Sequence, residues 1–471
     1  MQVNPQMFRG YDLRGVAGKD LNPEIVEHLG KAYGAFLLKN NINKAVVGRD
    51  CRLTSESYSQ AIIKGLLASG IDVVDIGLAL AGTIYWAQYY FKAEGCVSVS
   101  ASHNPAEYNG FKFGTGYSRT MVENEIQELR KIAEQDNFIS GQGNLTEKNI
   151  TEIYFADLAK RFPNLNKFKV VVDPSRSTPG AFVPELLKKV GCEVIESNCE
   201  LDGSFPAGTP DPTEKQVAER LSKKILAEKA DLGFSYDSDG DRLGVVDDKG
   251  TALWNDLIVA LFAASAIKKT AGAKIVFNAL CSKAVAETIK KAGGQAIMWR
   301  TGHSFIKAKA QQEQAKFAGE LSGHFYFLDN FYPHDDGCYS TLALLDYLSI
   351  NKKSLSRAVA DLPQYISSPE IKVGCPDETK VGLMNLVAQK SKQDFPAAEV
   401  IDDERVGDGV RLEMPDSMFI IRYSQNGPYL TVKFEALTQD KYDQLRTYIN
   451  NLLRSYEEID WNYGVNVESL N

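Results

Sequence analysis

The sequence predicts an α/β protein in which three related mixed-sheet α/β domains surround a central cleft and a smaller α+β domain follows at the C-terminus. Three observations support this fold class. A unit of strand, helix and strand recurs three times, over residues 45–77, 170–197 and 274–300. A chain of 471 residues is too long for one core, because a domain takes about 100 to 200 residues. The pattern also changes near residue 368.

Each repeat begins with a short apolar run that ends in a polar residue, and its helix closes on glycine before the next apolar run. A third strand then follows in each domain. The loops after the third strands carry the most reactive side chains in the chain: Ser102, His103, Asp237, Asp239, Asp241, Glu320, Ser322 and His324. Because ligands of open α/β sheets bind at the carboxyl ends of the strands, we expect the three loops to face one cleft.

A hairpin is expected after each of these loops and would add a strand to each sheet. It is clearest at residues 242–254, where the turn Asp-Lys-Gly separates two alternating runs. After residue 368, short alternating strands and helices at 379–393 and 440–455 predict the α+β domain. The expected domains are residues 1–148, 149–251, 252–368 and 369–471.

The composition is that of an ordinary globular protein, with 44% hydrophobic and 24% charged residues. The net charge of -8 argues against nucleic acid or an anionic membrane as a partner, since both need a clustered basic face. The longest apolar stretch, residues 257–267, is far below the roughly 20 residues of a membrane span, and the N-terminus does not resemble a secretory signal. We therefore expect a cytoplasmic protein that binds small molecules.

The seven cysteines are scattered and form no Cys-x-x-Cys pair, so we expect reduced and mostly buried thiols.

The first reactive loop reads Ser-Ala-Ser-His-Asn-Pro and presents Ser102 beside His103. A serine at a strand end is a common turn residue. It is also well placed as a nucleophile, because Pro105 ends the regular structure directly after it. The tripeptide alone leaves both interpretations open.

The second loop spaces Asp237, Asp239 and Asp241 two residues apart. Three carboxylates this close repel one another unless a cation lies between them, and hard oxygen ligands indicate Mg²⁺. A calcium EF-hand would need Gly at its sixth position and Glu at its twelfth, where this chain has Arg242 and Asp248. A solvated acidic turn is the remaining alternative.

The third loop, Gly-Glu-Leu-Ser-Gly-His, offers the carboxylate of Glu320, the hydroxyl of Ser322 and the imidazole of His324. Acceptor groups of this kind suit the hydroxyls of a sugar. Four of the five histidines, at positions 103, 303, 324 and 334, fall in or beside these loops. A single such histidine would more often be structural, and their concentration favours a functional site.

The last candidate segment is residues 422–428, Arg-Tyr-Ser-Gln-Asn-Gly-Pro, which follows a strand. An arginine fork with hydroxyl, amide and backbone N–H groups can bind a phosphate dianion, although an arginine at a strand end can also be plain surface. Near the N-terminus, Arg9, Tyr11 and Arg14 are available to the same cleft, as is Lys112 in a later strand.

Taken together, the motifs FRGYDLRG, SASHNP, YNGFKFG, DSDGDR, RTGHS, GELSGH and RYSQNGP closely resemble the phosphohexomutase superfamily, specifically its phosphomannomutase/phosphoglucomutase branch. They occur in the family order and span nearly the whole chain. The resemblance implies that Ser102 carries a phosphoryl group and that Asp237, Asp239 and Asp241 bind Mg²⁺ together with an oxygen on Ser102.

The resemblance also implies roles for the other candidates. Arg14, Lys112 and His324 match positions implicated in proton transfer, with His103 beside the nucleophile. The expected substrate-binding residues are Tyr11, Arg242, Gly302, His303, Glu320, Ser322, Arg422, Ser424 and Asn426. The implied reaction interconverts hexose 1-phosphate and hexose 6-phosphate, of mannose or glucose, through a phosphoserine and hexose 1,6-bisphosphate, which also serves as activator.

Two departures from the family pattern stand out. Gln425, Asn426 and Gly427 replace the usual central residues of the phosphate loop, and Leu280 stands where relatives often have a sugar-contacting lysine. A phosphoglucosamine mutase, a Mg²⁺-dependent sugar-phosphate phosphatase and a sugar-phosphate sensor remain alternatives, and the oligomeric state stays open.

Overall fold

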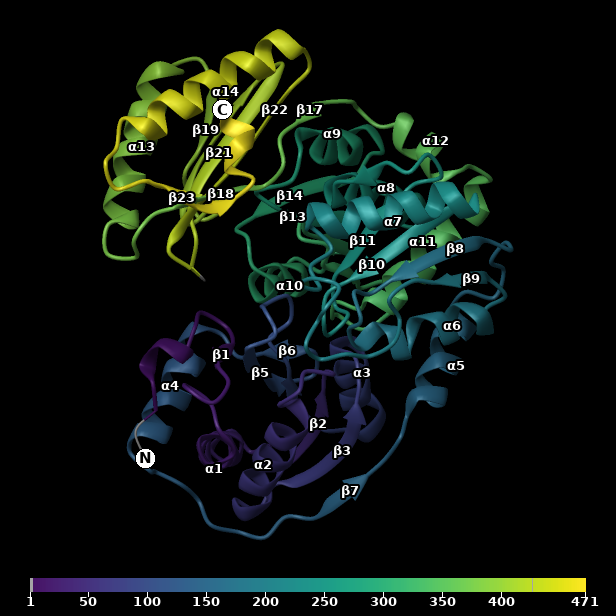
Figure 1. Cartoon of the computed structure of the whole chain (residues 1–471), viewed down its shortest axis with the longest axis vertical. Coiled ribbons are helices and arrows are strands. Elements are labelled where there is room, and N and C mark those ends of the chain that lie inside the picture. The colour runs from purple at the N-terminus through teal and green to yellow at the C-terminus, as the bar shows by residue number, and fades with distance from the viewer. Residues whose placement is uncertain (1–2, 426) are drawn as a thin grey trace. The chain divides into compact units, whose positions relative to one another are not determined.

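The computed structural model describes residues 3–425 and 427–471. The chain forms two compact units, each considered by itself: unit 1 comprises Met1–Asn255 and Ser322–Ala358, and unit 2 comprises Asp256–Leu321 and Val359–Asn471. Figure 1 shows the elements of both units with their labels. The four domain limits expected from the sequence stay a prediction, because this division is coarser.

The first sheet of unit 1 has seven strands: β1 (Leu13–Val16), β2 (Lys44–Arg49), β3 (Asp72–Leu78), β4 (Gly95–Val99), β5 (Tyr108–Gly116), β6 (Arg119–Thr120) and β7 (Leu145–Glu147). Their order is β1-β5-β4-β2-β3-β7, and β6 pairs with β5. Strands β4, β2, β3 and β7 are parallel, whereas β5 is antiparallel to both β4 and β1. The sheet is therefore mixed, and β5 is the added strand of the expected hairpin.

Four helices accompany this sheet: α1 (Pro23–Lys39), α2 (Ser55–Ala68), α3 (Ala81–Phe91) and α4 (Glu123–Glu134). The start of α1 is fixed by Asn22, whose side chain accepts a hydrogen bond from the N–H of Ile25 at 2.8 Å, with Pro23 at the first helical position. Helices α1 and α2 approach closely at Gly30 and Gly65, since a Cβ atom added to Gly30 would lie only 3.0 Å from the Cα of Gly65.

The second sheet of unit 1 repeats the same plan with five strands: β8 (Lys169–Asp173), β9 (Glu193–Glu196), β10 (Leu232–Tyr236), β11 (Leu243–Val246) and β12 (Ala252–Leu253). Their order is β12-β11-β10-β8-β9, with β10, β8 and β9 parallel and the hairpin β11–β12 antiparallel. This confirms the hairpin expected around residues 248–250. The helices are α5 (Thr151–Arg161), α6 (Val183–Lys189) and α7 (Lys215–Glu228).

Short helices and the remaining elements complete unit 1: η1 (Pro5–Met7), η2 (Thr178–Ala181), β16 (Phe325–Phe327) and α11 (Gly337–Asn351). Helix α12 (Leu355–Ala360) crosses the limit between the units.

Unit 2 begins within α8 (Asn255–Lys269) and continues through β13 (Lys274–Asn278), α9 (Lys283–Lys291), β14 (Gln295–Trp299), α10 (His303–Gln312) and β15 (Phe317–Gly319). Strand β13 pairs in parallel with β14 on one side and with β15 on the other. Because α8 is buried along most of its length, the long apolar run at residues 257–267 belongs to a core helix.

The C-terminal part of unit 2 is an antiparallel sheet: β17 (Ile366–Ser367), β18 (Ile371–Gly374), β19 (Glu399–Ile401), β20 (Gly409–Met414), β21 (Ser417–Tyr423), β22 (Tyr429–Ala436) and β23 (Asp460–Val465). The strand order is β19-β20-β21-β22-β18-β23, with β17 on β22. Helices α13 (Lys380–Asp394) and α14 (Gln439–Arg454) cover one face, as Figure 1 shows, and η3 (Val467–Leu470) ends the chain. This is the expected α+β domain.

The opposite face of this sheet is buried although it carries charges. Arg411 is fully buried, and its guanidinium donates to the backbone carbonyls of Ala279 at 2.6 Å and Cys281 at 2.7 Å. Glu435 accepts a hydrogen bond from the N–H of Lys283 at 2.8 Å. The sheet is thus joined to the loop before α9, within the same unit, by side chains that satisfy backbone groups.

All seven cysteines are free thiols, and six of them are buried, which confirms that expectation. Among the described residues, no helix combines the length and hydropathy needed to span a bilayer.

The contact between α1 and α2 yields a stability test. A Cβ atom on Gly65 would lie 2.3 Å from the carbonyl oxygen of Glu27 and 2.8 Å from the Cα of Gly30, so Gly65→Ala must push the two helices apart. We expect a loss of about 1 to 3 kcal/mol and a fall in Tm of several degrees. The matched control is Gly382→Ala in α13, where an added Cβ meets no described atom within 4 Å and should raise stability by up to about 1 kcal/mol. Calorimetry that finds both variants equally stable would contradict this packing.

Candidate active site

Ser102 lies three residues beyond the end of β4, in a buried loop of unit 1. Its backbone is left-handed, with φ of 50°, a conformation that a residue with a Cβ adopts only at a cost. The N–H of Ser102 donates to the hydroxyl of Ser100 at 2.8 Å, and its own hydroxyl donates to Asp237 Oδ2 at 2.5 Å. His103 Nδ1 lies 3.2 Å from the same hydroxyl. The serine hydroxyl is therefore held between a carboxylate and an imidazole.

The aspartate loop connects β10 to β11 and faces this serine. Asp237, Asp239 and Asp241 are all buried, and their ligand oxygens lie within 4.8 Å of one another. Burial raises the pKa of Asp237 well above its ordinary value, and the charges of Asp241 and Asp239 add to that rise. Within the described part of the chain, the Oδ1 atoms of Asp239 and Asp241 accept no hydrogen bond.

Lys112 reaches the same carboxylates from β5. Its Nζ lies 2.8 Å from Asp239 Oδ2 and 2.5 Å from Asp241 Oδ2. Burial opposes the charged form of Lys112, but the attraction of Asp239 and Asp241 is stronger and raises the pKa of the ammonium group. Arg242 Nε also lies 3.8 Å from Asp237 Oδ2, so two cationic side chains face three carboxylates and net negative charge remains in a buried space, which favours a divalent cation. Three hard oxygen donors, two of them with an oxygen that no described donor satisfies, fit Mg²⁺.

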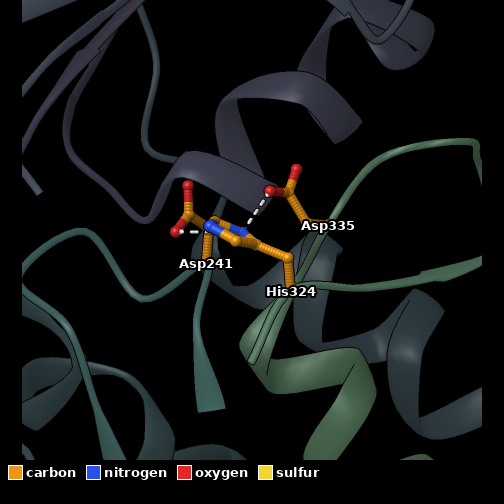
Figure 2. Close-up of side chains that lie close together, drawn as sticks. All are labelled: Asp241, His324 and Asp335. Carbon is orange, nitrogen blue, oxygen red and sulfur yellow. Dashed lines mark ion pairs between the residues drawn. The ribbon is translucent and has the colours of Figure 1, made fainter. Parts of the chain in front are cut away.

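The ring of His324 lies between Asp241 and Asp335, as Figure 2 shows. Its Nδ1 lies 2.7 Å from Asp335 Oδ2 and 3.6 Å from Asp241 Oδ1. Arg242 Nε donates to His324 Nε2 at 3.0 Å. This pattern assigns the proton of the neutral ring to Nδ1, facing Asp335, and leaves the lone pair on Nε2.

Arg14 and Arg242 border the serine and aspartate loops. Arg14, in β1, donates to Asp12 Oδ2 at 2.8 Å and to Asn104 Oδ1 at 2.6 Å, so it is tied to the loop of Ser102. The backbone N–H of Arg242 donates to Asp237 Oδ1 at 3.1 Å. Tyr11 is buried beside β1.

The candidates of unit 2 form two further groups. Glu320 is buried and accepts a hydrogen bond from the N–H of Gly302 at 3.0 Å. Gly302 precedes α10 with φ of 136°, which favours glycine, and buried His303 opens that helix. Ser322 belongs to unit 1, where it is partly exposed.

The phosphate-loop candidates end β21. Arg422 is buried and donates through Nε to Asp408 Oδ1 at 2.7 Å, with a second bond from Nη2 to Oδ2. Gln425 also donates to Asp408, at 3.3 Å, so one of the departures from the family pattern joins the same carboxylate. Ser424 is buried, and Asn426 lies outside the described residues.

Three partners of these groups were not among the sequence candidates. Asp335 holds the ring of His324, Asp408 holds Arg422, and Lys380 donates to the carbonyl of Ser424 at 2.6 Å. For Asp335 and Asp408, the only signal in the sequence is that each aspartate precedes a helix or a strand, a position that ordinarily indicates a cap or a turn.

The structure thus gathers Arg14, Ser102, His103, Lys112, the three aspartates, Arg242 and His324 in unit 1. In unit 2, it pairs Gly302 with Glu320 and brings Arg422 and Ser424 to the end of one strand.

The chain matches the three α/β/α domains that define phosphoglucomutase/phosphomannomutase. Domain I matches residues 5–140, domain II residues 150–250 and domain III residues 254–365.

Curated relatives align with this chain over nearly its whole length. The chain is 34% identical to phosphomannomutase/phosphoglucomutase of Pseudomonas aeruginosa, over 96% of each chain. It is also 34% identical to phosphoglucomutase of Neisseria gonorrhoeae, over 98% of this chain and 99% of the relative. A crystal structure of a phosphoglucomutase/phosphomannomutase family protein from Burkholderia thailandensis superposes with a TM-score of 0.89 at 31% identity, over 96% of this chain and 98% of that one.

Asp336, next to Asp335, has a structural role in unit 1. Its Oδ1 caps α11 by accepting from the N–H of Tyr339 at 2.9 Å, and its Oδ2 accepts from the hydroxyl of Tyr154 at 2.6 Å. Burial raises the pKa of Asp336 to about 6, although both hydrogen bonds oppose the shift.

Replacing this carboxylate should change how stability depends on pH. A folded-state pKa of about 6 exceeds the unfolded value near 4, so the folded protein holds the proton more tightly. That stabilising contribution is complete below about pH 4 and is lost as the pH rises to about 6. We expect the Tm of Asp336→Asn, relative to the unchanged protein, to increase from about pH 4.5 to pH 7 in calorimetry. A Tm difference that stays constant over this range would exclude the shift.

Proposed function

The chain belongs to the phosphoglucomutase/phosphomannomutase family and is a phosphotransferase of the mutase class, and we propose that it interconverts the 1-phosphates and 6-phosphates of mannose and glucose. The observation that carries this proposal is the hydrogen bond between the hydroxyl of Ser102 and Asp237, a member of the buried cluster of three carboxylates. The arrangement places a potential phosphoryl carrier directly at a site suited to a divalent cation.

Asp237, Asp239 and Asp241, with an oxygen on Ser102, would hold Mg²⁺. When bound, the cation would draw negative charge from the transferring phosphoryl group and so lower the barrier. Lys112 places a second positive charge at the same site, since its ammonium group contacts Asp239 and Asp241.

In the proposed reaction, phosphorylated Ser102 gives its phosphoryl group to the free hydroxyl of a hexose monophosphate. A bond forms between the sugar oxygen and phosphorus while the bond from phosphorus to Ser102 Oγ breaks, which yields hexose 1,6-bisphosphate. The bisphosphate turns around, and its other phosphoryl group returns to Ser102. The same bisphosphate, added in small amounts, would phosphorylate resting enzyme and act as activator.

His324 is the proposed base for the sugar hydroxyl: its Nε2 lone pair, which accepts from Arg242 Nε in this structure, would accept from the sugar hydroxyl instead when substrate binds. Asp335 would stabilise the imidazolium that forms, because its carboxylate lies 2.7 Å from Nδ1. Arg14 and Lys112 are the proposed donors that stabilise charge around Ser102 and can return the proton. His103, 3.2 Å from the Ser102 hydroxyl, would orient the nucleophile.

Substrate binding is proposed for the remaining candidates. Glu320 and Ser322 would accept hydrogen bonds from sugar hydroxyls, with Gly302, His303, Tyr11 and Arg242 around the sugar and its phosphate. Arg422, Ser424 and Asn426 would bind the distal phosphate. Asp408 supports this role because it fixes the guanidinium fork of Arg422. We also propose a cytoplasmic location, since the seven thiols are free.

The reaction can be followed directly by phosphorus NMR. The protein is incubated with Mg²⁺, a trace of glucose 1,6-bisphosphate and either mannose 1-phosphate, glucose 1-phosphate or glucosamine 1-phosphate. We expect the 6-phosphate of mannose or glucose without free phosphate, and no turnover after chelation of Mg²⁺ or in Ser102→Ala. Inorganic phosphate as the main product would instead establish a phosphatase, and turnover of glucosamine 1-phosphate alone would establish an aminosugar mutase.

The pairing of Asp335 with His324 predicts a second effect on activity. Asn at position 335 would present its amide N–H to Nδ1 and favour a proton on Nε2, which would then oppose the donating Nε of Arg242. We expect Asp335→Asn to lower kcat by at least about tenfold. The neighbouring variant Asp336→Asn is the control and should retain kcat within about threefold in the same coupled assay. Equal kcat values for the two variants would refute the role of Asp335.

A further inference from the structure

Arg52 is the most heavily engaged buried arginine of unit 1, yet it belongs to none of the groups considered so far. It follows β2, and its side chain has an exposed fraction of 0%. Its Nη2 donates to the carbonyls of Ser102 and Asn104, each at 2.6 Å. Its Nη1 donates to the carbonyls of Pro105 at 2.7 Å and Tyr108 at 3.0 Å. One guanidinium thus binds four backbone carbonyls, three in the loop that carries Ser102 and the fourth at Tyr108, the first residue of β5.

These bonds fix a loop that would not hold its shape by itself. Ser102 has φ of 50°, a left-handed backbone that is strained for a residue with a Cβ. The loop around it, residues 100–107, is irregular, and the carbonyls of Ser102, Asn104 and Pro105 belong to no strand. The planar fork of Arg52 supplies donors at fixed positions, which sets where the Ser102 peptide lies.

Asp50 balances the charge of Arg52 and extends the connection. Its Oδ2 accepts from Arg52 Nε at 3.1 Å and from the hydroxyl of Ser238 at 2.9 Å. Its Oδ1 accepts from the N–H of Arg52 at 3.0 Å and from the hydroxyl of Ser55 at 2.5 Å. Because Ser238 stands between Asp237 and Asp239 in the chain, the pair Asp50–Arg52 connects the serine loop of the first sheet to the aspartate loop of the second.

We propose that Arg52, together with Asp50, is a positioning residue for phosphoryl transfer: it fixes the left-handed backbone of Ser102 and sets the distance from the Ser102 hydroxyl to the carboxylate cluster. The proposal rests on the function proposed above. Arg52 donates to backbone carbonyls and to Asp50, so it acts through the loop. Its loss should therefore lower kcat far more than it changes KM, because a displacement of about 1 Å can cost around 100-fold in rate.

Arg220 provides a matched control. It pairs with Asp173 at 2.7 and 2.9 Å and donates to the carbonyl of Ala207 at 2.8 Å and to the hydroxyl of Ser175 at 2.7 Å. It therefore combines a carboxylate and a backbone carbonyl as Arg52 does, but in the loops of the second sheet that do not carry the reactive aspartates.

The test compares Arg52→Lys, Arg52→Gln and Arg220→Lys with the unchanged protein in a coupled mutase assay, at a temperature well below every Tm. Lysine keeps the charge but lacks the fork, so we expect Arg52→Lys to lower kcat about 10- to 100-fold and Arg52→Gln to lower it further, with KM within about threefold. Arg220→Lys should stay within about threefold in both constants. A kcat of Arg52→Lys equal to that of Arg220→Lys, or a loss that resides in KM, would overturn the proposal.

A structural measurement separates this proposal from the function on which it rests. Hydrogen exchange of the peptide over residues 101–108 should be faster in Arg52→Lys than in the unchanged protein, while the exchange of α7 stays the same. If the unchanged protein lacks mutase activity but exchange over residues 101–108 is still faster in Arg52→Lys, the proposed function fails and the positioning of the loop by Arg52 stands. Unchanged exchange with an active enzyme overturns the positioning.

Should the Arg52 variants not fold, Ser238→Ala tests the same connection, because it removes one hydroxyl and keeps Arg52. We expect its kcat to fall about 3- to 10-fold at unchanged KM, and an unaltered kcat would overturn the connection through Asp50.

Discussion

The mutual repulsion of three buried carboxylates is the constraint on which the active site depends. Asp237, Asp239 and Asp241 are buried, and their ligand oxygens lie within 4.8 Å of one another. At such distances, like charges cost several kcal/mol unless opposite charges lie close by. Lys112 and Arg242 supply two, and the negative charge that remains suits the site to a divalent cation. The repulsion that destabilises the three carboxylates is therefore also what favours the binding of a cation between them.

The same rule governs the buried charges of unit 2. Arg411, Arg422 and Glu435 alternate with apolar residues along the strands of the C-terminal sheet, so the apolar side chains face α13 and α14 and the charges face the other way. Each charge has a defined partner, such as Asp408 for Arg422 or the carbonyl of Ala279 for Arg411. Removing one partner would leave a buried charged group without a hydrogen bond, at a large cost in free energy, so only the arrangement that keeps every partner in place is stable.

Sequence patterns predicted what depends on neighbours in the chain. The alternation that marks β20, β21 and β22 and the turn between β11 and β12 are local, and the loops after β4 and β10 bring Ser102 next to Asp237. Asp335, Asp408 and Arg52 could not be found in this way. Asp335 follows the residue that it orients by 11 positions and Asp408 precedes Arg422 by 14, while Arg52 is 50 residues from Ser102. Their roles arise only when the chain folds, and locally each resembles a turn or surface residue.

The separation between these residues explains how the site keeps its geometry. The reactive groups stand on loops, which are the least constrained parts of an α/β fold. Here a buried charged side chain from another element holds each loop: Arg52 for the serine loop, Lys112 for the aspartate loop and Asp335 for His324. A charge in such a position cannot relax into water, so any movement of the loop breaks a strong hydrogen bond. The cost of burying these charges is therefore also the source of the precision with which the hydroxyl of Ser102 meets the carboxylate of Asp237.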